Sequence, residues 1–156
     1  MTIKVFLSKS NNVNPEYKYP IKLFQDFLLN EKDIETITLG GNYNTNEIPI
    51  KSIKNKMKEC YGAIILGTPQ IKKDNGEYMS TPWNQIEGAL AYDNDLPILI
   101  ISTTNPEINE GLFFTGTLPV HYNAVNLKSS NWFSEQNFAS ILNDWIRTVR
   151  EKFYKK

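Results

Sequence analysis

The sequence predicts an α/β fold, a three-layer sandwich in which helices cover both faces of a five-stranded parallel sheet. Two features of the chain lead to this class. Short β-branched or apolar runs alternate along the chain with segments whose apolar residues recur at helical spacing. The run "AIILG" at Ala63–Gly67 is apolar without interruption, which is typical of a strand buried on both faces in the middle of a parallel sheet.

Each of the five strands follows from a local pattern. The run "IKVFLS" is short and rich in β-branched residues, and "IETITL" alternates between polar and apolar positions. The runs "AIILG" and "LPILIIS" are mainly apolar, whereas "PVHYNAV" is a weaker strand pattern. We therefore expect strands that begin near Ile3, Ile34, Ala63, Leu96 and Pro119.

Two helices are expected between the first three strands. A polar loop ends in the turn signal Asn14-Pro15. Apolar residues then recur at helical spacing, at Ile21, Phe24, Phe27 and Leu28. The next stretch, "GGNYNTNEIP", is rich in Gly and Asn and is expected to be a loop. A second helix follows it, with Pro49 near its start and apolar positions at Ile50, Ile53 and Met57.

Two further helices are expected in the second half of the chain. The stretch "TPQIKKDNGEYMS" is expected to be a loop that precedes the third helix, which Thr81 caps and Pro82 begins. We expect Ile86, Ala89 and Leu90 to face one way, and Trp83 and Glu87 to share a different face of this helix. The last helix is capped by Ser134, and its apolar stripe is Phe138, Ile141, Leu142, Trp145, Val149 and Phe153.

The arrangement of these elements predicts where a ligand binds. Numbered along the chain, the strands are expected in the order 2-1-3-4-5, as in flavodoxin-like folds, with the ligand crevice at the C-terminal ends of strands one and three. The loops Ser8–Asn12 and Gly67–Gln70 and the start of the third helix lie there. We expect them to form one pocket, lined by Phe6, Ser8, Ser10, Thr68, Trp83 and Glu87.

The composition excludes several classes of function. The chain of 156 residues fits one domain over residues 1–156. Its 17 Lys and Arg balance 17 Asp and Glu, so no net charge favours binding to nucleic acid or to an anionic membrane. No apolar run is long enough to span a bilayer, and the N-terminus lacks a signal-peptide pattern. A single cysteine, Cys60, excludes an internal disulfide, so we expect a cytoplasmic protein with Cys60 in its core.

Glu87 is the main candidate for chemistry. It lies one turn after Trp83, and the small residues Gly88, Ala89 and Ala91 that follow it are expected to leave room for a ligand. Its helix meets the predicted crevice. The alternative is structural, because a glutamate near a helix start often stabilises the helix dipole, by under about 1 kcal/mol.

The sequence offers no other catalytic set. His121 is the only histidine and lies in the fifth predicted strand, so it is more often a structural residue. There is no His/Cys cluster for a metal and no glycine motif for phosphates, so neither a metal nor a cofactor is expected. A lone carboxylate among Ser, Asn, Thr and aromatic residues suits a reaction through a sugar oxocarbenium ion. Trp83 and Tyr43 are candidates for stacking a base.

Three stretches of the chain resemble TIR (Toll/interleukin receptor) domains. "KVFLSKS" resembles their first strand, which commonly ends Phe-x-Ser-x-Ser, and "IKSIKNKMKECYGAIILGTPQ" resembles their second helix and third strand. "TPWNQIE" resembles their S-x-W-C-x-x-E box, with Trp83 and Glu87 at its four-residue spacing. The likeness extends to about Ser102. It implies a flavodoxin-like domain in which Glu87 is the glutamate that enzymatic TIR domains require to cleave the nicotinamide–ribose bond of NAD.

The resemblance also implies a substrate, products and partners. NAD or a related nucleotide would be the substrate, and ADP-ribose or a cyclic ADP-ribose signal the product, as in the antiphage defence that bacterial TIR proteins often serve. TIR domains generally associate before they cleave NAD, so a homo-oligomer and a separate sensor or effector protein are implied. Together with the topology, the resemblance gives as substrate-binding residues Phe6, Ser8, Ser10, Asn11, Tyr43, Thr68, Trp83 and Asn84.

Two other functions stay open. The chain departs from the TIR box at Asn84, which replaces a cysteine, and at Gly88, which replaces a leucine. "IEGALAYDNDLPILI" also resembles nucleoside 2-deoxyribosyltransferases, in which the glutamate is the nucleophile, although their Gly-Thr before it is absent here. Other TIR domains are adaptors, or bind a nucleotide without cleaving it. An enzyme requires Glu87 in a pocket, whereas an adaptor does not.

Overall fold

The computed structural model describes residues 1–39, 49–104, 106–108, 110–114 and 120–155. Its centre is a five-stranded parallel sheet in the order β2-β1-β3-β6-β7. The strands are β1 (Ile3–Ser8), β2 (Ile34–Ile37), β3 (Ala63–Leu66), β6 (Ile98–Thr103) and β7 (His121–Val125). The predicted order 2-1-3-4-5 is confirmed, because β6 and β7 are the fourth and fifth predicted strands.

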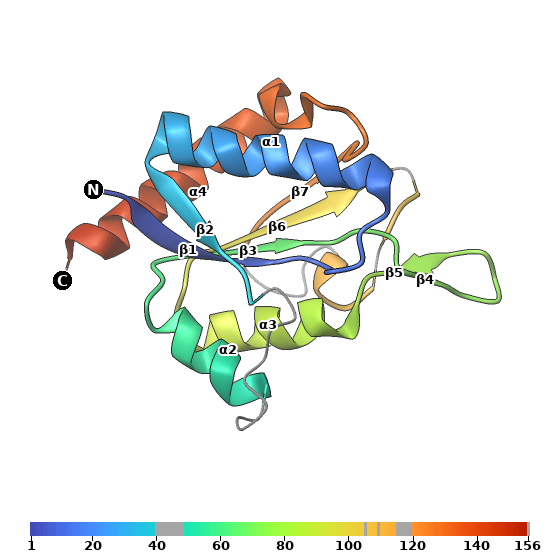
Figure 1. Cartoon of the computed structure of the whole chain (residues 1–156), viewed down its shortest axis with the longest axis horizontal. Coiled ribbons are helices and arrows are strands. Elements are labelled where there is room, and N and C mark those ends of the chain that lie inside the picture. The colour runs from blue at the N-terminus through green and yellow to red at the C-terminus, as the bar shows by residue number, and fades with distance from the viewer. Residues whose placement is uncertain (40–48, 105, 109, 115–119, 156) are drawn as a thin grey trace.

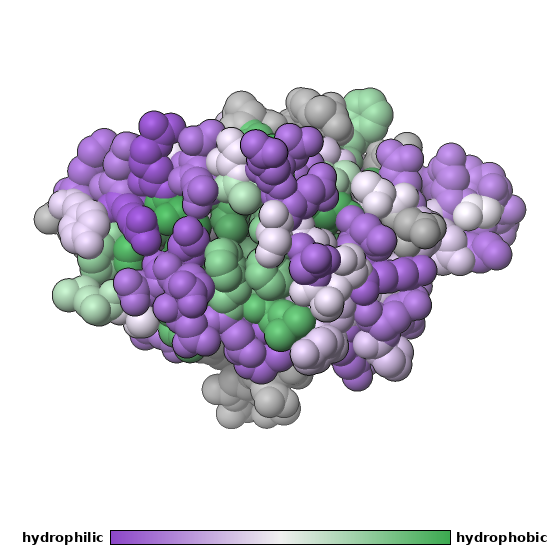
Figure 2. Space-filling model, turned by 90° about the horizontal axis from the view of Figure 1, so that it is seen from above, coloured by the Kyte–Doolittle hydropathy of each residue, from purple (hydrophilic) through white to green (hydrophobic). Residues whose placement is uncertain are grey.

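Helices cover both faces of the sheet, as predicted for a three-layer α/β fold. One layer holds α1 (Pro15–Lys32) and α4 (Gln136–Tyr154), and the other holds α2 (Pro49–Met57) and α3 (Pro82–Asp93) (Figure 1). On the face that carries α1 and α4, hydrophobic side chains gather along the middle and hydrophilic ones surround them (Figure 2). No helix within the described residues combines the length and the apolar character needed to cross a membrane.

The alternation of side chains along the strands divides the core in two. Val5 and Leu7 of β1 belong to the cluster beneath α1 and α4, whereas Phe6 belongs to the cluster beneath α2 and α3. Ile64 and Ile65 of β3 are divided in the same way. The central strand β3 is therefore apolar at every position because both of its faces are covered.

Several predicted boundaries shift for local reasons. The fourth strand begins at Ile98 rather than Leu96, and the fifth is described from His121, since Pro119 lies outside the described residues. Ser134 does not cap α4, contrary to the prediction. It ends a short 3-10 helix, η2 (Trp132–Ser134), in which its N–H donates to the carbonyl of Asn131 at 2.9 Å, and α4 begins at Gln136.

The apolar positions expected to share one face of α3 do not form its buried face. The helix buries Asn84, Glu87, Gly88 and Ala91, while Ala89 is exposed. The apolar pattern did not indicate the buried face, because the side chains of Asn84 and Glu87 face the C-terminal edge of the sheet. Hydrogen bonds there offset the cost of burying them.

A short hairpin replaces part of the loop expected before α3. Its strands, β4 (Ile71–Lys72) and β5 (Tyr78–Met79), pair antiparallel and are too short to give an alternating pattern in the sequence. The turn contains Gly76 at φ 86°, a backbone conformation that favours glycine. The Asn-Gly pair of this turn is a hairpin signal that would have located it.

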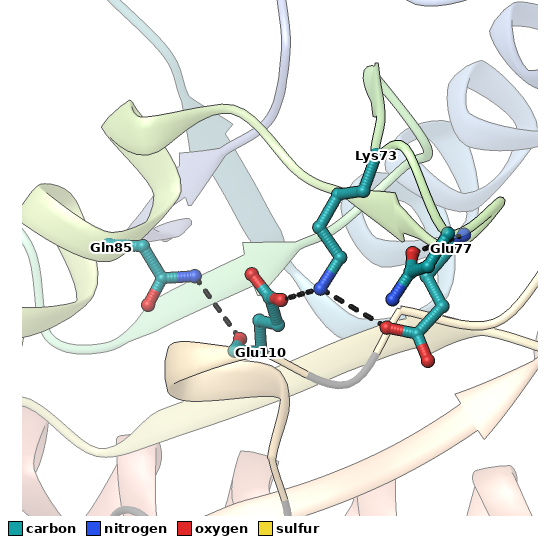
Figure 3. Close-up of polar contacts among 5 residues, drawn as sticks. Lys73, Glu77, Gln85 and Glu110 are labelled. Carbon is teal, nitrogen blue, oxygen red and sulfur yellow. Dashed lines mark hydrogen bonds and ion pairs between the residues drawn. The ribbon is translucent and has the colours of Figure 1, made fainter.

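An ion-pair network ties the hairpin to the segment that follows β6. The Lys73 ammonium lies between the carboxylates of Glu110 and Glu77, and its nitrogen is 3.1 Å from a Glu77 oxygen (Figure 3). Gln85 of α3 contacts the same segment, because its Oε1 accepts from the N–H of Leu112 at 2.8 Å. The hairpin, α3 and the residues around η1 (Gly111–Phe113) are thus linked by polar contacts.

Candidate functional site

Glu87 lies at the C-terminal end of β1, held by the helix that carries it. Helix α3 begins where the Thr81 side chain accepts from the N–H of Trp83 at 3.4 Å, with proline at the first helical position. One and a half turns later the Glu87 carboxylate meets the last residue of β1. There the Ser8 hydroxyl donates to Glu87 Oε1 at 2.9 Å, within the buried interior.

Asn84 extends this contact into a chain of hydrogen bonds. Its Nδ2 donates to Ser8 Oγ at 2.8 Å and lies 3.4 Å from the carbonyl oxygen of Leu66, at the end of β3. Only 1% of Asn84 is exposed, so it forms part of the support beneath the carboxylate. The Ser8 hydroxyl accepts a hydrogen bond from Asn84, so its own hydrogen remains available to donate to Glu87. The arrangement therefore aims a hydroxyl donor at one oxygen of Glu87.

Burial dominates the electrostatics of this carboxylate. Glu87 is 7% exposed, and burial raises its pKa from the ordinary value of 4.5 to about 7, against the opposing effect of the Ser8 hydrogen bond. Among the described residues no lysine, arginine or histidine forms an ion pair with it. Glu87 is thus a buried acid without a positive partner in that part of the chain, which makes it a candidate for contact with a cationic group.

A cavity of about 230 Å³ opens beside Glu87. Its walls come from the end of β1 and the loop after it, from the residues after β2, and from the start of α3. The lining residues are Leu7, Lys9, Ser10, Asn11, Asn12, Thr38, Leu39, Thr81, Trp83 and Glu87. The cavity therefore lies at the C-terminal ends of β1 and β2, beside the switch point between β1 and β3, and none of the described residues directly after β3 lines it.

The predicted site residues divide into three groups in the structure. Ser10, Asn11, Trp83 and Glu87 line the cavity, and Trp83 is 36% exposed. Ser8 contacts the carboxylate from the buried side, and Asn84 contacts Ser8. Phe6 and Thr68 do not line the cavity, and Tyr43 lies outside the described residues.

Phe6 and Thr68 are occupied elsewhere. The side chain of Phe6 alternates to the face of β1 beneath α2 and α3, where it is fully buried in the apolar core. Thr68 follows β3 and its hydroxyl accepts from Gln70 Nε2 at 2.8 Å. Depth along the strand decides the first case, because Phe6 shares the face of Ser8 but lies two residues before it, away from the C-terminal end of β1.

The sequence did not single out several lining residues. Lys9 and Asn12 belong to the same loop as Ser10, so the predicted crevice already contained them. Thr38 and Leu39 follow β2, which pairs with β1 in the predicted order. Both residues would have been predicted if the expected pocket had included the C-terminal end of β2.

The small residues near Glu87 do not leave room for a ligand. A Cβ atom on Gly88 would lie 1.9 Å from Leu112 Cδ1, and one on Gly67 would lie 2.6 Å from the ring of Phe113. Both glycines accommodate the segment around η1, which packs over the ends of β3 and β6. The expectation that Gly88 makes space for substrate is therefore wrong, and the open space lies toward β1 and β2.

A larger cavity, of about 620 Å³, lies near the N-terminal ends of the strands and includes Cys60 and Pro97 in its lining. Burial raises the pKa of the Cys60 thiol to about 11, so it stays protonated near neutral pH. The described residues contain no group of three His, Cys, Asp or Glu side chains placed to hold a metal. The cavity beside Glu87 is therefore the candidate site.

No family model matches the chain, and no curated protein matches it. Among solved structures, the crystal structure of a conserved protein from Enterococcus faecalis V583 is similar to it, with 11% sequence identity and a TM-score of 0.49. The similarity covers 97% of this chain and 99% of that chain.

Proposed function

We propose that the protein cleaves the N-glycosidic bond of a nucleotide with a positively charged base, and that NAD is the first substrate to test. One observation carries this proposal. Glu87 is a buried carboxylate with a raised pKa, a serine donor and no positive partner among the described residues. A cationic substrate would supply the missing positive charge and favour the ionised carboxylate.

The reaction follows from the charges. As the bond between ribose C1′ and the pyridinium nitrogen breaks, its electron pair goes to the nitrogen and nicotinamide leaves as a neutral molecule. Positive charge then develops on the ribose, where the Glu87 carboxylate stabilises it or forms a covalent ester. Water completes hydrolysis by adding to C1′ and losing a proton, which gives ADP-ribose. An internal nitrogen of the same molecule as acceptor would give a cyclic product instead.

Ser8 and Trp83 have distinct roles in this proposal. The Ser8 hydroxyl holds one carboxylate oxygen in place through its 2.9 Å bond, which leaves the other oxygen for the ribose. Trp83 lines the cavity and is partly exposed, so its ring offers a stacking surface for the base. A cavity of about 230 Å³ suits the reacting ribose and base, with the rest of a dinucleotide outside it.

A nucleoside or nucleotide glycosyl transfer is the second candidate, and the small cavity favours it. In that reaction a neutral base leaves, Glu87 forms the ester, and a second base accepts the sugar. A neutral leaving base needs a proton from the site, whereas a cationic base leaves without one. For this reason we place the cationic nucleotide first. The assembly and antiphage role that the TIR resemblance implies depend on the first candidate.

The test compares the parent protein with Glu87→Gln, using NAD, nicotinamide mononucleotide and deoxynucleosides as separate substrates. The glutamine keeps the size of the side chain and removes its charge, so we expect cleavage to fall about 100- to 1000-fold, by analogy with the loss of other charge-stabilising groups. Glu31→Gln, an exposed change on α1, is the matched control.

Each outcome has a defined reading. Equal turnover by the parent and Glu87→Gln would show that Glu87 is not catalytic. Turnover of a deoxynucleoside but not of NAD would favour the transferase. If the parent cleaves none of these substrates but binds NAD, the protein is a nucleotide-binding module.

A further inference from the structure

We propose that Lys9 forms a phosphate subsite in the Glu87 cavity, so that the substrate is a nucleoside 5′-phosphate or a larger nucleotide rather than a nucleoside. This inference rests on the proposed N-glycosidic reaction and names its substrate class. Lys9 follows β1 directly and lines the cavity with Glu87.

The cavity holds two opposite charges that do not pair. Lys9 and Glu87 are its only ionisable lining residues among those the structure describes, since the rest are Ser, Asn, Thr, Leu and Trp. No ion pair between them is formed, and within the described ranges no other carboxylate pairs with Lys9. Two unpaired opposite charges in one small cavity match a ligand that carries both signs.

The surroundings of Lys9 favour the binding of an anion beside it. Lys9 is partly buried, and burial lowers the pKa of its ammonium, with a second contribution from the positive charge of Lys18 on α1. Two positive charges close together, one of them on a cavity wall, are both relieved by a bound anion. Ser10, Asn11 and Asn12 come next in the loop and supply neutral donors near the same place.

A nucleotide with a cationic base fits this arrangement of charges. Its ribose carries the scissile bond at C1′ and the phosphate at C5′, which is attached to C4′ across the ring oxygen from C1′. With C1′ at the Glu87 carboxylate, the phosphate lies toward another wall of the cavity, and Lys9 is the cation available there. A nucleoside has no phosphate and would leave the Lys9 ammonium unpaired.

The test compares two substrates that differ only in the phosphate, nicotinamide mononucleotide and nicotinamide riboside. We expect the parent to have a higher kcat/KM for the mononucleotide. Lys9→Met keeps the apolar stem and should lower that preference about ten- to one-hundred-fold, the effect of losing one charge-assisted contact, with little change for the riboside. Lys9→Arg should restore most of it. Lys54→Met, an exposed change on α2, is the control.

A second measurement separates this inference from the reaction itself. Calorimetry of ribose 5-phosphate and ribose should show tighter binding of the phosphate by the parent, and Lys9→Met should remove the difference. If no substrate is cleaved but this binding pattern holds, the subsite stands and the proposed reaction fails. If both substrates are cleaved and Lys9→Met leaves their ratio unchanged, the subsite is refuted and the reaction stands. Equal binding of both sugars by the parent would also refute it.

Discussion

The raised pKa of Glu87 predicts an unusual dependence of stability on pH. A carboxyl with a higher pKa in the folded state binds its proton more tightly there than in the unfolded chain. Its contribution to stability is therefore fully present below its unfolded pKa and is lost as pH rises through its folded pKa. For Glu87 these limits are 4.5 and about 7, so the parent should become less stable across this interval.

The size of the effect follows from the same two values. At about 1.4 kcal/mol per pH unit, the interval from 4.5 to about 7 corresponds to about 3 kcal/mol. Most of this falls between about pH 5 and about pH 8.5. Glu87→Gln has no ionisable group at this position, so its free energy of unfolding should lack this loss.

Urea unfolding of the parent and Glu87→Gln across this pH range measures the difference. Groups that titrate in both proteins cancel in the difference between their free energies of unfolding. Glu31→Gln should show the same pH dependence of stability as the parent. Relative to the parent, we expect Glu87→Gln to become more stable as pH rises, by about 2 to 3 kcal/mol over the range. A difference that stays constant within about 0.5 kcal/mol would refute the argument that burial raises the pKa of Glu87, because linkage would then show no such shift.

Three further predictions test the contacts around the site. Because the ionised Glu87 stabilises the cation, a pH–rate profile should show kcat/KM for NAD rising with pH through about 7. Ser8→Ala removes the hydrogen bond that lowers the pKa of Glu87, so this variant should show the same rise at higher pH. Gly88→Ala should lower the free energy of unfolding by about 1 to 3 kcal/mol, because its Cβ would meet Leu112, and the double change with Leu112→Ala should not add the two losses. Trp145→Ala should cost about 3 to 5 kcal/mol in urea unfolding, because the indole is fully buried; a loss below 1 kcal/mol would contradict its place in the core.

The sheet was predictable from the sequence because its strands are buried on both faces. Unbroken apolar runs such as Ala63–Leu66 leave little choice of element, and their alternation with helices constrains the order. The buried face of α3 was not predictable in the same way. It buries Asn84 and Glu87, which a hydrophobic pattern places outside, and their burial depends on Ser8, which is 79 residues from Glu87 in the sequence.

The candidate site was likewise predictable only in part. The place of Glu87 near the ends of the strands followed from the strand order, whereas Phe6 was assigned to the pocket without regard to its depth in the core. Phe6 and Ser8 share one face of β1, but Phe6 lies two residues further from the C-terminal end of the strand and is fully buried, so Ser8 reaches Glu87 and Phe6 does not line the cavity. The contact of Leu112 with Gly88 joins residues from separate elements, and no local pattern reports it.

The packing of Leu112 and Phe113 over the ends of β3 and β6 has a consequence for the order of events in the proposed reaction. None of the described residues in this segment lines the cavity, whose walls come from the β1, β2 and α3 side. A leaving base and an incoming acceptor then share the approach from that side. While the base remains there, it competes with water for the ribosyl group. The rate at which the base departs therefore determines whether the ribosyl group is hydrolysed or transferred back to a base.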